Sequence, residues 1–96
     1  MNIYLTAIIK SKPEFVQEVK AVLENMVVHT RKESACLQYD LHQSIENENI
    51  FVFYEIWKNQ FGLDNHNAQP YIEEFRQLVT EKLAGFPEIY LTQKVS

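Results

Sequence analysis

The spacing of hydrophobic residues alternates between two periods along the chain, and the two periods together predict its strands and helices. A period of two, typical of strands, marks four segments, and a period near 3.6, typical of helices, marks two longer segments between them. The predicted strands are 2–10, 36–45, 50–57 and 88–95; the predicted helices begin at Pro13 and Pro70, and a short helical turn leads from Asn59 to His66.

Residues that begin and end helices support these boundaries. Pro13 and Pro70 fit the first helical turn, where the missing N–H has no partner to lose. Asn59 is a good N-cap for the short turn. Gly85 fits the C′ position that ends the last helix.

The predicted order, β-α-β-β-α-β, is the split βαβ or ferredoxin-like arrangement of an α+β protein. We expect one domain over residues 1–96, with both helices on one face of a four-stranded antiparallel sheet. Phe51, Phe53 and Trp57 are predicted to lie on the uncovered face, where they would expose too much aromatic surface to water. The sequence therefore predicts a homodimer, with a second copy packed sheet to sheet.

Residues 50–57 and His66 also form the most plausible site in the sequence. Glu55 and Trp57 are two residues apart, so they share one strand face with Phe51 and Phe53. A carboxylate in an aromatic row is costly to bury unless it is paired, protonated or beside a cavity. His66 could hang over the cavity mouth, where an imidazole can serve as a base near neutral pH.

Each of these residues also has a plain structural role. Glu55 could form a salt bridge near the dimer seam, Trp57 could be core, and His66 could bond solvent or backbone. Tyr39, expected on one face with Leu37 and Leu41, could bond a phenolic substrate or only pack. Cys36 is expected to be a small buried side chain rather than a nucleophile.

Composition narrows the classes of partner and cofactor. The net charge of −4 and the scattered Lys and Arg residues argue against nucleic acid. No apolar run approaches the ~18–20 residues of a membrane span, and the single cysteine suits a reducing cytosol, so we expect a cytoplasmic protein without a membrane segment. We also expect no metal, because His29, His42 and His66 lack ligand spacing, and no flavin or nucleotide, because there are only two glycines.

Three separated segments resemble a known family. They are Glu33-Ser34-Ala35-Cys36-Leu37-Gln38-Tyr39, Phe53-Tyr54-Glu55-Ile56-Trp57 and His66, similar to the E-x-G-C-x-x-Y … E-x-W … H pattern of the antibiotic biosynthesis monooxygenase superfamily. The resemblance covers nearly the whole chain and implies a dimeric α+β barrel. Several members oxidise quinols or polycyclic phenols with dioxygen and no cofactor; others degrade haem, and one branch processes a quorum-sensing signal.

The sequence departs from that pattern at three informative positions. Ala35 stands where the family usually has glycine, and Tyr71 where many quinol-oxidising relatives have a second histidine. Ala7 stands near the asparagine of the haem-degrading branch, and because alanine cannot hydrogen-bond a haem ligand, that activity is disfavoured.

The resemblance and the residues together favour a cofactor-independent monooxygenase acting on a small aromatic, phenolic or quinol-like molecule. His66 would be the catalytic base or orienting group. The predicted substrate contacts are Trp57, Phe53, Tyr39, Glu55 and Phe51. Two alternatives remain open: a non-catalytic, dimeric small-molecule-binding or stress-related protein, and a signal-processing isomerase on the same fold.

Overall fold

The computed structural model describes all 96 residues and has the predicted order of elements. The strands are β1 (Ile3–Lys10), β2 (Cys36–Gln43), β3 (Ile50–Trp57) and β4 (Glu88–Thr92); the helices are α1 (Val16–Thr30), α2 (Gln60–Asn67) and α3 (Pro70–Glu81), with a 3₁₀ turn at Pro13–Phe15 before α1.

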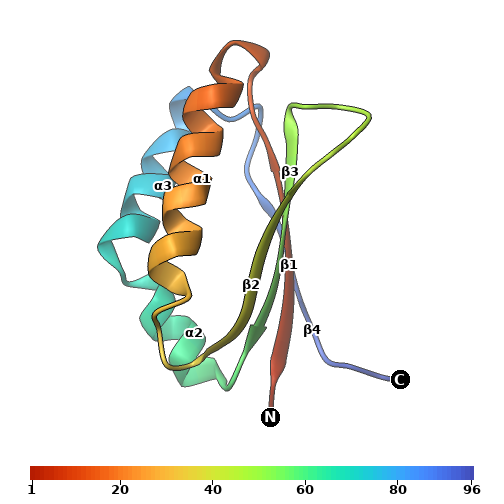
Figure 1. The fold of residues 1–96 in the computed structure, drawn as a ribbon, viewed down its shortest axis with the longest axis vertical. Coiled ribbons are helices and arrows are strands. Elements are labelled where there is room, and N and C mark those ends of the chain that lie inside the picture. Colours follow the sequence, from red (N-terminus) through yellow and green to blue (C-terminus); the bar gives the residue numbers. More distant parts are fainter.

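The four strands form one antiparallel sheet in the order β2-β3-β1-β4. All three helices lie on the same side of this sheet, and the other side carries no element of the chain (Figure 1). The predicted ferredoxin-like α+β fold is therefore confirmed. β1 is central, as its apolar sequence indicated, but only one of its faces is covered within the chain.

The core lies between the helices and the sheet. The inner face of β1 supplies Leu5, Ala7 and Ile9, and the inward stripe of α1 includes Val19 and Leu23, which are fully buried. Burying an aliphatic side chain of this size contributes about 1.5–3 kcal/mol. This layer therefore fixes the helices against the sheet.

The prediction that Phe51, Phe53 and Trp57 lie on the open face is wrong. Their exposed fractions are 0%, 1% and 0%, because this row of β3 points toward the helices. The open face instead carries the alternate row of β3, Val52, Tyr54 and Ile56. Both rows are apolar, so the period of two shows that there are two faces without showing which one the helices cover.

Smaller corrections concern the element ends. A bulge between Cys36 and Gln38 turns Leu37 outward, so Leu37 does not share a face with Tyr39. α3 ends at Glu81, well before Gly85, and no glycine has a positive φ, so Gly85 is not the C′ residue. β2 and β4 each end a few residues earlier than predicted.

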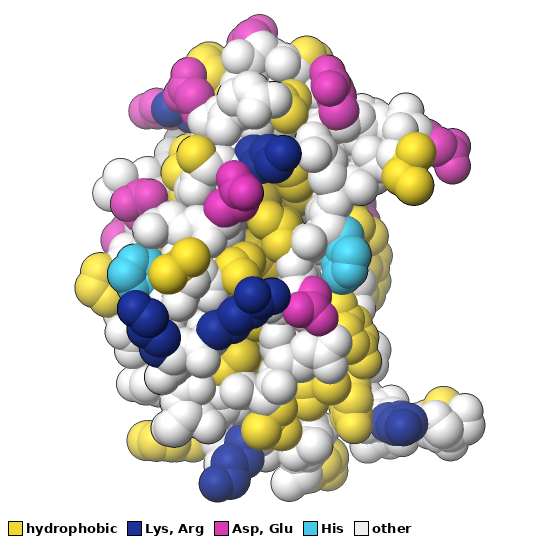
Figure 2. Space-filling view, viewed as in Figure 1, with side chains coloured by type: hydrophobic (Ala, Val, Ile, Leu, Met, Phe, Trp, Pro, Cys, Tyr) yellow, Lys and Arg dark blue, Asp and Glu magenta, His cyan; other side chains and the backbone are white.

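The open face has an apolar centre. Tyr4 and Ile8 of β1 lie beside the outward row of β3, and the edge strand β2 adds polar residues there. In the space-filling view, hydrophobic side chains follow the sheet side of the molecule, whereas charged side chains of both signs are scattered elsewhere (Figure 2). No continuous basic surface is visible on this side.

Candidate functional site

Helix α2 carries His66 into the protein interior. The Asn59 side chain caps the helix by accepting a hydrogen bond from the Gly62 backbone N–H at 2.8 Å. Leu63 and His66 are three residues apart, so they share the inward face of the helix. His66 is 4% exposed, and its ring therefore lies inside the protein rather than over a cavity mouth.

A close contact fixes where α2 sits. A Cβ at Gly62 would lie 2.3 Å from the Ala35 Cβ, closer than two carbon atoms can approach. Glycine at this position therefore lets α2 pack directly against the segment before β2. That segment also carries Glu33, so the same contact sets the spacing of Glu33 and His66.

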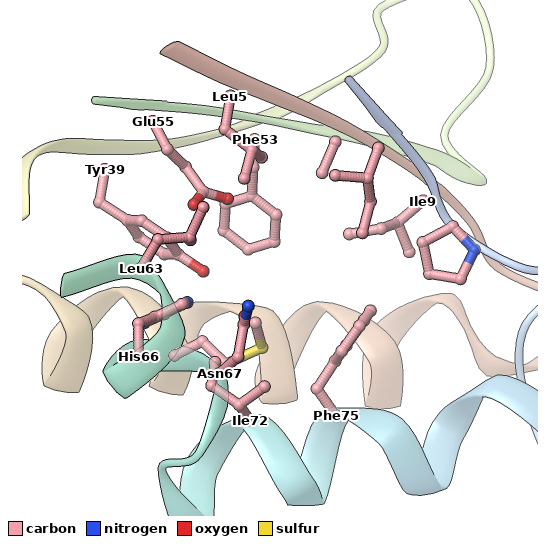
Figure 3. Close-up of a pocket in the computed structure, with 14 residues that line it drawn as sticks. Leu5, Ile9, Tyr39, Phe53, Glu55, Leu63, His66, Asn67, Ile72 and Phe75 are labelled. Atoms are coloured by element: carbon pink, nitrogen blue, oxygen red, sulfur yellow. The ribbon is translucent and has the colours of Figure 1, made fainter. Parts of the chain in front are cut away.

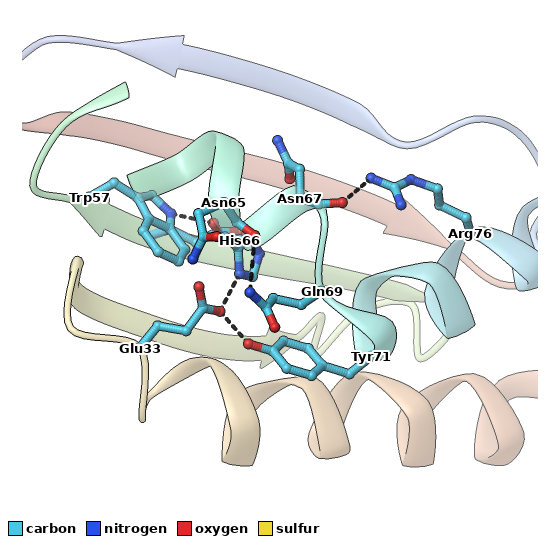
Figure 4. A network of polar contacts seen from close by, with 9 residues as sticks. Glu33, Trp57, Asn65, His66, Asn67, Gln69, Tyr71 and Arg76 are labelled. Carbon is cyan, nitrogen blue, oxygen red and sulfur yellow. Dashed lines mark hydrogen bonds and ion pairs between the residues drawn. The ribbon is translucent and has the colours of Figure 1, made fainter. Parts of the chain in front are cut away.

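Glu33 and His66 form a hydrogen-bonded pair that is largely, though not fully, buried. His66 Nδ1 lies 2.7 Å from Glu33 Oε2, and the Tyr71 hydroxyl donates to the same oxygen (Figure 4). A carboxylate can only accept hydrogen bonds, so Nδ1 carries the proton and the Nε2 lone pair is left available. Tyr71 is itself held in place by stacking on His29, with ring centroids 5.2 Å apart.

The environment keeps His66 neutral. Burial lowers the pKa of the His66 imidazole, and the hydrogen bond and charge of Glu33 offset only part of this effect. A neutral imidazole whose Nδ1–H is fixed by a carboxylate can accept a proton at Nε2. The pair therefore has the geometry of a general base and its orienting acid.

Glu55 is the second buried carboxyl group of the site. Its Oε1 accepts a hydrogen bond from Trp57 Nε1 at 2.8 Å, and the residue is 4% exposed. Burial raises the pKa of Glu55 to about 7, the Trp57 bond opposes the rise, and the charge of Glu33 adds to it. Near neutral pH, Glu55 therefore exchanges between its neutral and charged forms.

These groups meet at a cavity of about 70 Å³ between the sheet and the helices (Figure 3). Tyr39, Phe53, Glu55 and His66 line it, along with aliphatic side chains of β1 and residues of α2 and α3. The Tyr39 ring packs on Phe53 at 4.9 Å and on His66 at 5.6 Å between centroids. Burial raises the pKa of the Tyr39 hydroxyl, which therefore stays protonated and can donate.

The structure brings most of the predicted site residues together. Tyr39, Phe53, Glu55 and His66 share the cavity, and Trp57 packs against the His66 ring with centroids 4.5 Å apart. Phe51 is buried in the core and does not line the cavity. That these residues bind or transform a ligand stays a prediction.

Sequence reasoning gave no role to Glu33 or Tyr71. Glu33 appeared only as the first letter of the family pattern, and Tyr71 only as a replacement for a histidine. Their contacts with each other and with His66 span 38 and 33 residues of sequence, so no local spacing could reveal them. The one available signal was their presence at positions where the family pattern has ionisable residues.

Other reactive groups stay outside this arrangement. Burial raises the pKa of the Cys36 thiol to about 11, which keeps it protonated and weakly nucleophilic. No three His, Cys, Asp or Glu side chains come together as a metal site would require. None of the helices has the length and apolar character needed to cross a bilayer.

A ferredoxin-like sheet whose helices enclose an imidazole, two carboxyls and an apolar cavity defines a small α+β protein suited to binding small molecules. The profile of the antibiotic biosynthesis monooxygenase family matches residues 2–94. The chain therefore belongs to the antibiotic biosynthesis monooxygenase family.

Individual relatives agree with this assignment. A Bacillus subtilis protein named "Putative monooxygenase YcnE" is 37% identical over 91 residues, covering 95% of this chain and 96% of the relative. The Synechocystis protein sll1783 is 33% identical over 81 residues, covering 84% of this chain but only 55% of that protein. The crystal structure of a conserved Methanosarcina mazei protein superposes with a TM-score of 0.89 at 32% identity, covering 98% of this chain and 93% of that one.

Proposed function

We propose that this protein is a cofactor-independent monooxygenase that oxidises a small phenolic or quinol-like molecule with dioxygen. The observation that carries the proposal is the Glu33–His66 pair, in which the carboxylate takes the Nδ1 side and leaves Nε2 as the acceptor of an imidazole that lines a mainly apolar cavity. Membership of the antibiotic biosynthesis monooxygenase family supports the reaction class. The name of the Bacillus subtilis relative supports it as well.

The chemistry needs a base, an electron-rich ring and protection from water. His66 Nε2 takes the hydroxyl proton, and the resulting phenolate gives one electron to dioxygen. Recombination of the two radicals forms a C–O bond at a ring carbon, giving a hydroperoxide. Loss of water from that carbon leaves a quinone carbonyl, and the proton held by His66 leaves with the water. One oxygen atom enters the product, and the substrate supplies every electron.

The remaining site residues would bind and orient the ring. Phe53 and the aliphatic lining supply apolar contact, Tyr39 donates to the ligand oxygen, and Trp57 supports the His66 ring from behind. Glu55 faces the same space and, when neutral, can donate a second hydrogen bond. Phe51 is not among the proposed ligand contacts because no part of it lines the cavity.

Oxygen uptake tests the proposal directly. Purified protein in chelator-treated buffer is mixed with a panel of hydroquinones and naphthols, and dioxygen consumption and quinone absorbance are followed together. His66→Asn keeps a donor for Glu33 and removes the base, so we expect turnover to fall by about 10²–10⁴. His42→Ala, on the opposite face of the sheet, is the matched control and should retain turnover.

Absence of uptake with every electron-rich phenol, in a protein that binds them, would contradict the proposal. An isomerase is then the second candidate, because His66 and a neutral Glu55 can remove and return protons without dioxygen. Ligand binding without any turnover would instead support the non-catalytic binding protein.

We also propose that two copies associate through the open face of the sheet. The support is the group of apolar side chains on that face, which a second sheet could cover; they surround Thr6 and are Tyr4, Ile8, Val52, Tyr54 and Ile56. This is the predicted homodimer with a different set of contact residues, since Phe51, Phe53 and Trp57 are enclosed by the helices.

A further inference from the structure

The cavity is polar at one end and apolar at the other. Tyr39, Glu55 and His66 bring their hydroxyl, carboxyl and imidazole groups to one end (Figure 3). Ile9 and Phe75 lie at the other, where the lining has no charged group.

Exposure shows which end opens to solvent. The three polar residues are each no more than 4% exposed, whereas Asn67, which follows His66 and also lines the cavity, is exposed. Ile89 is 58% exposed and belongs to β4, a short edge strand whose residues are all exposed. The mouth therefore lies between β4 and the side formed by α2 and α3, where Ile89 and Asn67 are exposed. The buried hydroxyl, carboxyl and imidazole groups are the last that an entering ligand meets.

The charges around the cavity disfavour an anionic ligand. No lysine or arginine lines it. The Arg76 guanidinium acts on His66 only through its charge, and its N–H groups donate to Glu73 at 3.0 Å and to the Asn67 carbonyl (Figure 4). Glu55 lines the polar end and Glu33 lies behind His66, so a ligand carboxylate there would meet like charge with no cation in the lining to pair with it.

We propose that the ligand is a small neutral amphiphile: a single phenolic ring that enters hydroxyl first, with a short alkyl chain opposite the hydroxyl that extends toward Phe75 and Ile89. The hydroxyl meets Tyr39, Glu55 and His66, and the chain fills the apolar end. A cavity of about 70 Å³ is well below the ~300–1,000 Å³ of sites for drug-sized ligands and below the ~150 Å³ of a cavity that holds benzene, so several rings are excluded and even one ring requires the cavity to widen at its mouth. The choice of a hydroxyl as the reacting group rests on the proposed function; the direction of entry and the neutral charge do not.

A homologous ligand series tests this orientation. 4-n-Alkylphenols from methyl to pentyl are titrated against the protein while the fluorescence of Trp57, the only tryptophan, reports binding. Burial of each further methylene should tighten binding about fourfold until the chain passes the mouth. 4-n-Alkylbenzoates of equal length should bind at least ~10-fold more weakly because their charge is unpaired. n-Alkylbenzenes should also bind more weakly, because the polar groups then lose their partner.

Two variants show where the alkyl chain of the ligand lies. Phe75→Ala enlarges the apolar end and should move the optimum to longer chains, with little change for 4-methylphenol. Phe61→Ala is the matched control, since Phe61 is 82% exposed on α2 and does not line the cavity. Affinity that ignores chain length, benzoates that bind as well as phenols, or an optimum unmoved by Phe75→Ala in a folded variant would each overturn the inference.

The outcomes separate this inference from the proposed function. If phenol affinity depends on alkyl-chain length but no dioxygen is consumed, the monooxygenase proposal is refuted and the proposed ligand class is retained. Dioxygen uptake with phenols whose affinity is independent of chain length would refute the ligand class and leave the monooxygenase standing.

Discussion

Glu33 acts on the site through His66, since it lies behind the imidazole rather than against the cavity. Its Oε2 accepts from both His66 and Tyr71, while its Oε1 is buried without a hydrogen-bond partner. A buried carboxylate with only one engaged oxygen depends strongly on its donors. Changes at Glu33 or Tyr71 should therefore alter the protonation of His66.

We expect Glu33→Gln to lower kcat by about 10²-fold or more with a smaller change in KM, because an amide can donate to Nδ1 and so favour the wrong tautomer. Tyr71→Phe keeps the carboxylate and should have a milder effect. Without the Tyr71 donor, Glu33 interacts more strongly with the imidazolium, so the pKa of His66 should rise. ¹⁵N NMR of the His66 ring and the pH profile of kcat check both variants; an unchanged tautomer in Glu33→Gln would contradict this role.

Glu55 should make stability depend on pH. Burial holds its pKa at about 7 in the folded protein, against ~4.3 in an unfolded chain. The folded state binds the proton more tightly, so the free energy of unfolding falls as the pH rises from about 4 to 7.

Glu55→Gln keeps an oxygen for Trp57 Nε1 and removes the charge. We expect it to be more stable than the wild type by up to about 3 kcal/mol at pH 8, with the difference disappearing near pH 4. Urea unfolding at both pH values measures this, and His66 titrates in both proteins, so its effect cancels. Glu46→Gln, at an exposed carboxylate, should show no such difference; a pH-independent gain in Glu55→Gln would contradict the shift.

Much of the site could be predicted at the residue scale. The strand period placed Phe53, Glu55 and Trp57 in one row, and the family pattern added Tyr39 and His66. The strand period could not place Glu33, because a carboxylate in the turn between α1 and β2 has no periodic signal and its partners are distant in sequence.

At the scale of elements, the sequence predicted the boundaries of β1, β3 and α2 to within a residue or two. It did not predict which face of β3 points toward the helices. Phe51, Phe53 and Trp57 alternate with Val52, Tyr54 and Ile56, so either row could have formed the core. The helices cover the row with the larger aromatic side chains, and this choice depends on packing volume rather than on polarity. The error reversed the predicted dimer contacts while leaving the fold intact.

The packing of α2 gives a prediction at this scale. In an ordinary helix, Gly→Ala stabilises by up to ~1 kcal/mol. Here the new Cβ would meet Ala35, so Gly62→Ala should instead destabilise by about 1–3 kcal/mol. In Ala35→Gly/Gly62→Ala, the nearest atom of residue 35 is its Cα at 3.7 Å, and most of the loss should be recovered. Thermal unfolding of both single variants and the double variant measures the coupling; purely additive effects would show that this contact is not the cause.

At the scale of the whole molecule, the open sheet face predicts a homodimer. Light scattering after size exclusion should give twice the chain mass at micromolar concentration. Tyr54→Lys places a charge at the centre of that face and should produce a folded monomer. Val28→Lys, at an exposed site on α1, is the matched control and should remain dimeric. A monomeric wild type would contradict the proposed association.

The cavity lies between the sheet and the helices, on the side opposite the face proposed for association. In a dimer associated sheet to sheet, the two cavities would lie on opposite outer sides with both sheets between them, so we expect ligand binding at one site to leave the other unaffected. Saturation should be hyperbolic, with a Hill coefficient of about one. The Tyr54→Lys monomer should bind ligand as tightly as the dimer, so the second copy would serve solubility and stability rather than cooperativity.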